Sequence, residues 1–264
     1  HSNSLEKGLL NYTIGENYYQ NGDLIKSTLY FKKAVSILEF HKKTNLELLN
    51  KVRLYLAGIY YYEEKENEYY QILKKTTIDQ GSDNYTLNAI LYLSVFEATK
   101  GDYYSGLKRL NAVLAKKSDL EVRTRIQINI IDVYSIMCEI GSSTKRESDY
   151  KIIKNHHQIV ENNFFKTNLN ESQLYDTYNN LANIYQAFGD SNKAIELYEK
   201  AKEYYKKHGY ISKMLDVMNN LGYVYAKLNK KEKAATYFNK IIQSSDDIYQ
   251  KATAYDNKGY FLNT

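Results

Sequence analysis

The segment YNNLANIYQAFGDSNKAIELYEKA spans residues 178–201, and the segment MNNLGYVYAKLNKKEKAATYFNKI spans residues 218–241. The two align without a gap at a shift of 40 residues. Residues of similar size and polarity occupy the matching positions: Leu181 and Leu221, Ala182 and Gly222, Tyr185 and Tyr225, Ala194 and Ala234, Tyr198 and Phe238, and Ala201 and Ile241. Such self-similarity at a fixed period indicates a repeat architecture.

Each copy has the pattern of two helices joined by a tight turn. Tyr178, Leu181 and Tyr185 recur at steps of three and four residues, so they form an apolar stripe along a first helix. A second stripe of the same period begins at Ala194, after a turn at Gly189. Glycine can adopt the left-handed conformation that ends a helix, and small residues on both helices let the two backbones approach. The repeated unit is therefore predicted to be a helical hairpin.

The order of residue types in these hairpins resembles the tetratricopeptide repeat family. In that family an aromatic residue, Leu, a small residue and Tyr mark the first helix, and a small residue, an aromatic residue and Ala mark the second. The small residue of the first helix recurs along the chain as Gly15, Ala57, Ser94, Ile131, Ala182, Gly222 and Gly259, with Ile131 as a poor match. We therefore expect an all-α fold, a single right-handed superhelical solenoid of TPR-like helix-turn-helix repeats over residues 1–264.

Six helix pairs and a terminal half repeat are expected, at residues 8–41, 50–77, 87–116, 124–161, 175–207, 215–244 and 252–264. Successive small-residue positions are 37 to 51 residues apart, which exceeds the family's period of about 34. The longest step has to accommodate an insertion at 141–149 and a linker at 162–172. Over-long repeats of this kind resemble those of bacterial peptide-responsive regulators of the Rap and PlcR type, and those of sensor proteins with tetratricopeptide repeats.

Composition indicates a folded helical protein. Proline is absent and only 12 residues are Gly, so little interrupts long helices, and no apolar run approaches the roughly 20 residues of a membrane span. The formal charge of +5 is spread over stretches that also carry acidic residues, which favours a solvated surface. Nucleic acid would be bound only through an output domain outside this chain. The single Cys138 excludes an internal disulfide, so a cytoplasmic location is expected, with an exported or periplasmic sensor domain as the alternative.

The sequence contains no recognisable catalytic centre. It lacks a glycine-rich phosphate loop, a serine nucleophile elbow and an HExxH motif. His157 and Glu161 have the spacing of paired metal ligands on a helix, but no third ligand cluster accompanies them. His156 and His157 are therefore interpreted as surface residues of a helix. The chain is not expected to be an enzyme or to use a cofactor or metal.

Asparagines of the first helices are the candidates for a binding site. An Asn side chain offers both a donor and an acceptor, so a ladder of them can pair with the backbone of an extended peptide. In the resembling family this side of the first helix lines a concave wall. The predicted peptide-binding residues are Asn179, Asn183, Asn219, Asp216 and Tyr223, with Tyr19, Tyr61 and Tyr62 as apolar walls of pockets between repeats. The open alternative is a bridge between neighbouring repeats, made by Asn180, Asn220 and Asn257.

The leading hypothesis is a non-catalytic domain that binds a peptide or protein segment, as the sensing part of a bacterial signalling or transcription-regulatory protein. The alternative is a structural adaptor that scaffolds a multiprotein complex. Docking of an acidic C-terminal tail is disfavoured, because Tyr12, Leu54 and Leu91 stand where that subset of the family has basic residues. The apolar end at Tyr260 and Phe261 predicts a homodimer through the C-terminal end, or continuation of the natural chain.

Overall fold

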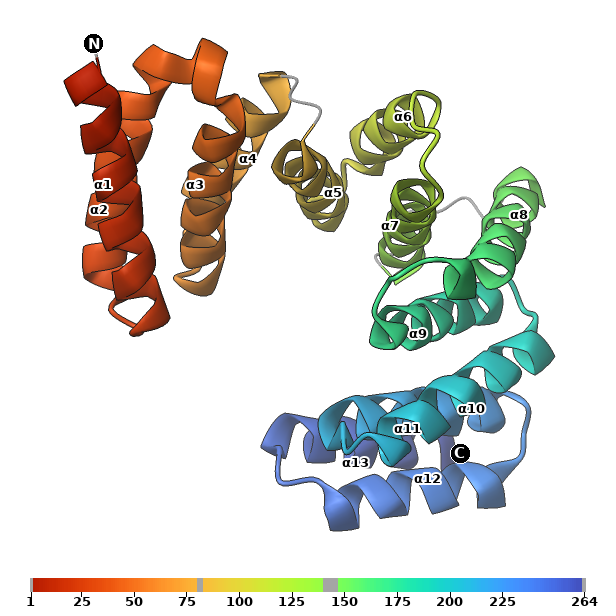
Figure 1. The fold of residues 1–264 in the computed structure, drawn as a ribbon. Coiled ribbons are helices and arrows are strands. Elements are labelled where there is room, and N and C mark those ends of the chain that lie inside the picture. Colours follow the sequence, from red (N-terminus) through yellow and green to blue (C-terminus); the bar gives the residue numbers. More distant parts are fainter. Residues whose placement is uncertain (1, 80–82, 140–146, 263–264) are drawn as a thin grey trace. The chain divides into compact units, whose positions relative to one another are not determined.

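The computed structural model describes residues 2–79, 83–139 and 147–262, and these residues are almost entirely helical (Figure 1). The chain divides into two compact units, residues 1–111 (unit 1) and residues 112–264 (unit 2). Unit 1 contains α1 (Ser2–Gln20), α2 (Leu24–Leu38), α3 (Lys42–Tyr62), α4 (Glu66–Ile78), α5 (Asn84–Thr99) and most of α6 (Tyr103–Leu114). Unit 2 contains α7 (Leu120–Glu139), α8 (Glu147–Asn163), α9 (Glu171–Ala187), α10 (Ser191–Lys207), α11 (Ile211–Lys227), α12 (Lys231–Ser244) and α13 (Ile248–Leu262). Two 3-10 turns follow α2 and α8, η1 (Glu39–His41) and η2 (Phe164–Lys166).

The helices form consecutive hairpins, each made of a first helix with an odd number and a second helix with an even number. The helices of a pair contact each other, as α1 and α2, α9 and α10, and α11 and α12 do. No strand occurs in the described part of the chain. The prediction of an all-α fold built from TPR-like hairpins is thus confirmed. None of the described helices is both long and apolar enough to span a lipid bilayer.

Residues of the expected insertion and linker fall partly into helices. Of the insertion, residues 141–146 lie outside the described part of the chain, and residues 147–149 form the first turn of α8. Residues 162 and 163 complete α8, η2 follows, and α9 begins at Glu171 within the expected linker. Only residues 167–170 of that linker are therefore without helical structure.

The turn inside a hairpin depends on one residue in the left-handed region. Among the described residues, five hairpin turns have a positive φ at this position, at Gly22, Glu64, Gly101, Gly189 and Asn229. The backbone N–H of the next residue donates to a carbonyl in the last turn of the first helix, from Asp190 to Tyr185 at 2.8 Å and from Lys230 to Tyr225 at 2.9 Å. These bonds satisfy carbonyl groups that the helix end would otherwise leave unpaired. The Tyr that marks the end of the first helix in the sequence is thus the residue whose carbonyl closes the turn.

The small residue of the first helix lets an aromatic ring of the second helix lie directly on its backbone. A Cβ atom added at Gly222 would lie 2.6 Å from Cε1 of Phe238, and one added at Gly15 would lie 2.7 Å from Cδ1 of Phe31. Both Phe rings are fully buried. A Cβ atom added at Gly259 would meet no described atom within 4 Å. The close crossing therefore occurs at the first two glycines and is absent at the third.

Unit 1 is also held by a buried charge that the sequence pattern did not reveal. Arg53 of α3 is fully buried, and its guanidinium donates to Glu39 at 2.7 Å and to Asp79 at 2.6 Å. Burial opposes ionisation of Asp79, yet the bonds from Lys42 and Arg53 keep the pKa of this carboxyl below its ordinary value. A buried charge is tolerated only when it is paired and hydrogen-bonded. Arg53 thereby ties α3 to the ends of α2 and α4.

Replacing Gly222 with Ala should lower the stability of the protein, whereas replacing Gly259 with Ala should not. Alanine is favoured over glycine within a helix by roughly 0.5–1 kcal/mol. At Gly222 the added methyl group has to displace the buried ring of Phe238, and overpacking costs about 1–3 kcal/mol. We expect urea titrations to show a loss of about 1 kcal/mol in unfolding free energy for Gly222→Ala and a small gain for Gly259→Ala. A gain of equal size at both positions would contradict the close crossing at Phe238.

Candidate functional site

The first helices of unit 2 carry the polar surface on which the predicted asparagines lie. α9 contacts both α7 and α11, and α11 contacts α13 (Figure 1). We call the polar side of α9, α11 and α13 the first-helix face. Its residues are Asp176, Asn179, Asn180 and Asn183 on α9, Asp216, Asn219, Asn220 and Tyr223 on α11, and Gln250 and Asn257 on α13.

One hydrogen bond recurs between neighbouring first helices. The donor lies two residues before the small residue of its own helix. The acceptor lies on the preceding first helix, one residue after the position that corresponds to the small residue there. Asn180 Nδ2 donates to Asp132 Oδ1 at 2.9 Å, and Asn220 Nδ2 donates to Asn183 Oδ1 at 3.4 Å. The shared register means that this bond links α7 to α9 and α9 to α11 in the same way.

Unit 1 contains the same link with other residue types. The Tyr55 hydroxyl donates to Glu16 Oε1 at 2.9 Å, and the Tyr12 hydroxyl donates to the same oxygen at 2.6 Å. The bond from Tyr12 is the main cause that lowers the pKa of Glu16. Tyr19 belongs to this cluster, because its ring centre lies 5.2 Å from that of Tyr55. The structure thus places Tyr19 in the packing between the first two repeats.

The last link departs from the pattern because its acceptor position holds a tyrosine. Tyr223 packs its ring against Phe261 of α13, with ring centres 5.1 Å apart. Asn257 Nδ2 donates instead to Asn219 Oδ1 at 3.0 Å. Asn180, Asn220 and Asn257 therefore all bridge neighbouring repeats, in agreement with the second of the two interpretations of the asparagine pattern.

Both polar atoms of the Asn183 side chain form hydrogen bonds inside the protein. Its Nδ2 donates to Glu139 at 3.0 Å, and its Oδ1 accepts from the hydroxyl of the buried Tyr198 at 2.5 Å. These bonds come in addition to the one from Asn220. These bonds of Asn183 help to hold α7, α9 and α10 together.

Several amides on the first-helix face retain unused hydrogen-bonding capacity, and in Asn179 and Asn219 this capacity includes the amide nitrogen. Asn179 Oδ1 is buried, and no group in the described part of the chain donates to it. Asn219 uses its Oδ1 to accept from Asn257, while none of the described residues accepts from its Nδ2. Asp216, one helical turn before Asn219, accepts from Gln250 Nε2 at 2.7 Å. A buried amide oxygen without a donor costs about 1–3 kcal/mol, so Asn179 is the residue of this face whose role the fold does not explain.

The remaining predicted residues lie in unit 1. Tyr61 and Tyr62 occupy the last turn of α3 and are 71% and 76% exposed. Tyr61 contacts Tyr69 of α4, with ring centres 5.5 Å apart. Tyr61 and Tyr62 therefore offer exposed aromatic surface in unit 1, whereas the five polar and aromatic candidates of α9 and α11 lie in unit 2.

Both histidines of α8 are buried, so the expectation that they lie at the surface is wrong. His156 Nδ1 contacts Gln127 Oε1 of α7, and His157 Nδ1 lies 2.9 Å from the hydroxyl of Tyr185 of α9. Burial lowers the pKa of both imidazoles, which favours their neutral forms. Within residues 2–79, 83–139 and 147–262, no three metal-ligating side chains gather in one place. The histidines instead fasten α8 to its neighbours, because the polar partners that they need come from α7 and α9.

Hairpins that stack through repeated bonds between their first helices define a helical repeat protein. Residues 173–246, which include α10, α11, α12 and nearly all of α9, match the family described as Tetratricopeptide repeat. Residues 173–246 therefore carry tetratricopeptide repeats, a fold that generally mediates protein–protein interaction. No curated protein matches the chain.

Replacing Asp132 with Asn should stabilise the protein at neutral pH. Burial raises the pKa of the Asp132 carboxyl to about 6, although the bond from Asn180 acts in the opposite direction. Since the pKa is lower in the unfolded chain, this carboxyl destabilises the folded state progressively as the pH rises from about 4 to about 6. Asn carries no charge to bury and still offers an acceptor to Asn180.

We expect Asp132→Asn to exceed the parent protein by about 1–2 kcal/mol in unfolding free energy at pH 7, with a difference that fades below about pH 4. Urea titrations over this pH range measure the difference, and subtraction of the parent values removes the contribution of other titrating groups. A difference that does not change with pH would show that ionisation of Asp132 is not its cause.

Proposed function

We propose that the first-helix face of unit 2 binds an extended segment of another polypeptide. The observation that supports this proposal most strongly is the contrast among its asparagines. The amide nitrogens of Asn180, Asn183 and Asn220 donate to neighbouring helices, whereas no residue in the described part of the chain accepts from Nδ2 of Asn179 or Asn219. A ligand that supplies acceptors at these two positions pairs with donors that the fold leaves unused.

The two unpaired amide groups suit a peptide backbone. Asn179 and Asn219 hold equivalent positions, three residues before the small residue, on the neighbouring helices α9 and α11. An extended peptide presents C=O groups, which match the free Nδ2 donors of Asn179 and Asn219. Asp216 and Tyr223 lie one turn on either side of Asn219 and add an acceptor and an apolar wall. Backbone pairing of this kind holds a peptide without selecting its sequence.

The wider role that we propose is that of a sensing domain in a bacterial signalling or regulatory protein. Support for it comes from the over-long repeats, which resemble those of peptide-responsive regulators. The alternative is an adaptor that scaffolds a complex. An adaptor of this kind would bind a folded surface of its partner and not a short peptide segment. Tight binding of a short free peptide therefore favours the sensor over the adaptor.

Asn179→Leu combined with Asn219→Asp should weaken peptide binding without lowering stability. Leu has a similar shape and removes the buried unpaired oxygen, while Asp keeps the oxygen that accepts from Asn257 and removes the free donor. Two lost hydrogen bonds, at about 0.5–1.5 kcal/mol each, should weaken binding roughly tenfold or more. The probe is a labelled peptide selected on the intact chain from a random displayed library. Fluorescence anisotropy gives its Kd, and circular dichroism gives the melting temperature of each variant.

Asn220→Leu is the matched control. It removes the bond to Asn183 Oδ1, so it should lower the melting temperature and leave the Kd of the peptide unchanged. Unchanged affinity of the double variant for the selected peptide would show that Asn179 and Asn219 are not the binding site.

A further inference from the structure

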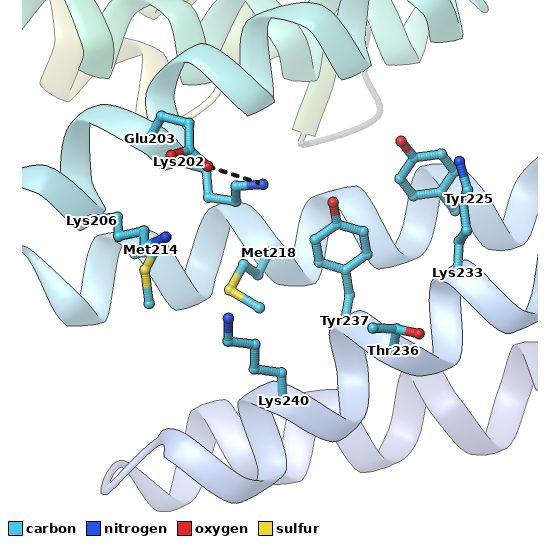
Figure 2. A pocket seen from close by; sticks show the side chains of 10 residues that line it. All are labelled: Lys202, Glu203, Lys206, Met214, Met218, Tyr225, Lys233, Thr236, Tyr237 and Lys240. Carbon is cyan, nitrogen blue, oxygen red and sulfur yellow. Dashed lines mark ion pairs between the residues drawn. The ribbon is translucent and has the colours of Figure 1, made fainter.

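The second helices of unit 2 form a groove whose chemistry differs from that of the first-helix face. α10 and α12 supply its two sides and α11 its floor, and it encloses about 390 Å³ (Figure 2). Met214 and Met218 of α11 lie at its centre and are almost completely buried. Lys206 of α10 and Lys240 of α12 extend toward these methionines from opposite sides (Figure 2). The groove thus combines an apolar centre with a cationic rim.

The positive charge of the rim is only partly neutralised inside the protein. Lys202 pairs with Glu199 and lies 3.5 Å from Glu203, the one acidic residue of the lining. In the described part of the chain, no carboxylate pairs with the other three lysines of the lining, Lys206, Lys233 and Lys240. Several uncompensated charges of one sign around a recess attract ligands of the opposite sign. The groove therefore favours an anionic ligand.

The aromatic rings of the groove favour a protein ligand over a nucleic acid. Tyr225 and Tyr237 stack on each other, with ring centres 5.7 Å apart and planes inclined by 10°. The ammonium of Lys233 lies 5.3 Å from the ring centre of Tyr225, and that of Lys202 lies 5.7 Å from the ring centre of Tyr237. Proteins hold unpaired bases by stacking them on aromatic faces, and here those faces are already occupied. Methionine, in contrast, adapts its shape to apolar side chains of a protein partner.

We propose that the groove between α10 and α12 is a docking site for an acidic segment of a partner protein. The segment places an apolar side chain over Met214 and Met218, and its carboxylates lie beside Lys206 and Lys240. Charge complementarity steers the encounter, and burial of the apolar side chain stabilises the complex. None of the groove residues belongs to the first-helix face, so this site does not depend on peptide binding there.

The test uses a labelled, end-capped peptide of sequence Glu-Glu-Leu-Leu-Glu-Glu, titrated with the intact chain at low ionic strength and followed by fluorescence anisotropy. Lys206→Gln combined with Lys240→Gln should weaken binding about tenfold. Lys207→Gln combined with Lys231→Gln is the matched control, since it removes the same charge from the same two helices outside the groove, and it should change the Kd by less than about twofold. All four lysines are exposed, so both variants should melt like the parent protein.

Two further probes separate the proposed occupant from other anions. A peptide with Ser in place of both Leu residues should bind about tenfold more weakly, because it lacks the apolar contact with Met214 and Met218. An oligothymidylate of equal charge should bind more weakly than the Leu peptide. Equal weakening by the two lysine variants, equal or tighter binding of the oligothymidylate, or no binding of the Leu peptide to the parent chain would each overturn the proposal.

Discussion

Close approach of the two helices in a hairpin is the constraint on which the rest of the structure depends. Where the first helix has Gly15 or Gly222, a Phe ring of the second helix packs directly against the backbone of the first helix. Burial of that ring fixes the position of the two helices relative to each other along their axes. The left-handed turn residue, such as Gly189, brings the chain back in the direction that this contact requires. With the hairpins fixed in this way, the residue two positions before the small residue reaches the preceding first helix in one register at Tyr55, Asn180 and Asn220. These three bonds between repeats build on the crossing within the repeat.

The hairpins could be predicted from the sequence because stripe spacing, turn glycines and small residues act over a few neighbouring positions. The partners between repeats could not, because they depend on the register of helices whose small residues are 37 to 51 positions apart. Asn180 and Asn183 are three residues apart and chemically identical, yet one bridges to Asp132 and the other is held by Glu139 and Tyr198. His157 was expected at the surface for the same reason, since its residue type does not show that α9 offers it a partner.

Unit 2 presents two surfaces with different chemistry. The first-helix face offers neutral amides, which suit the backbone of a peptide, and the groove of the second helices offers ammonium groups around methionine, which suit acidic and apolar side chains. α11 contributes adjacent residues to both, Asn219 to the face and Met218 to the groove. The groove was not foreseen because Lys202 and Lys206, one turn apart on α10, look alike in a sequence of mixed charge. Only their surroundings show that carboxylates neutralise the first and leave the second unpaired.

Some asparagines of α9 and α11 bind the peptide in this account, and others bridge neighbouring repeats. NMR spectroscopy of their side-chain amide groups tests this distinction most directly. The resonances of individual Asn side chains can be followed in spectra of the isotope-labelled intact chain while the selected peptide is added. We expect the resonances of Asn179 and Asn219 to shift on binding, because these amides gain partners, and those of the bridging Asn180 and Asn220 to stay in place. Unmoved resonances of Asn179 and Asn219 at saturating peptide would contradict the claim, as would shifts confined to the bridging pair.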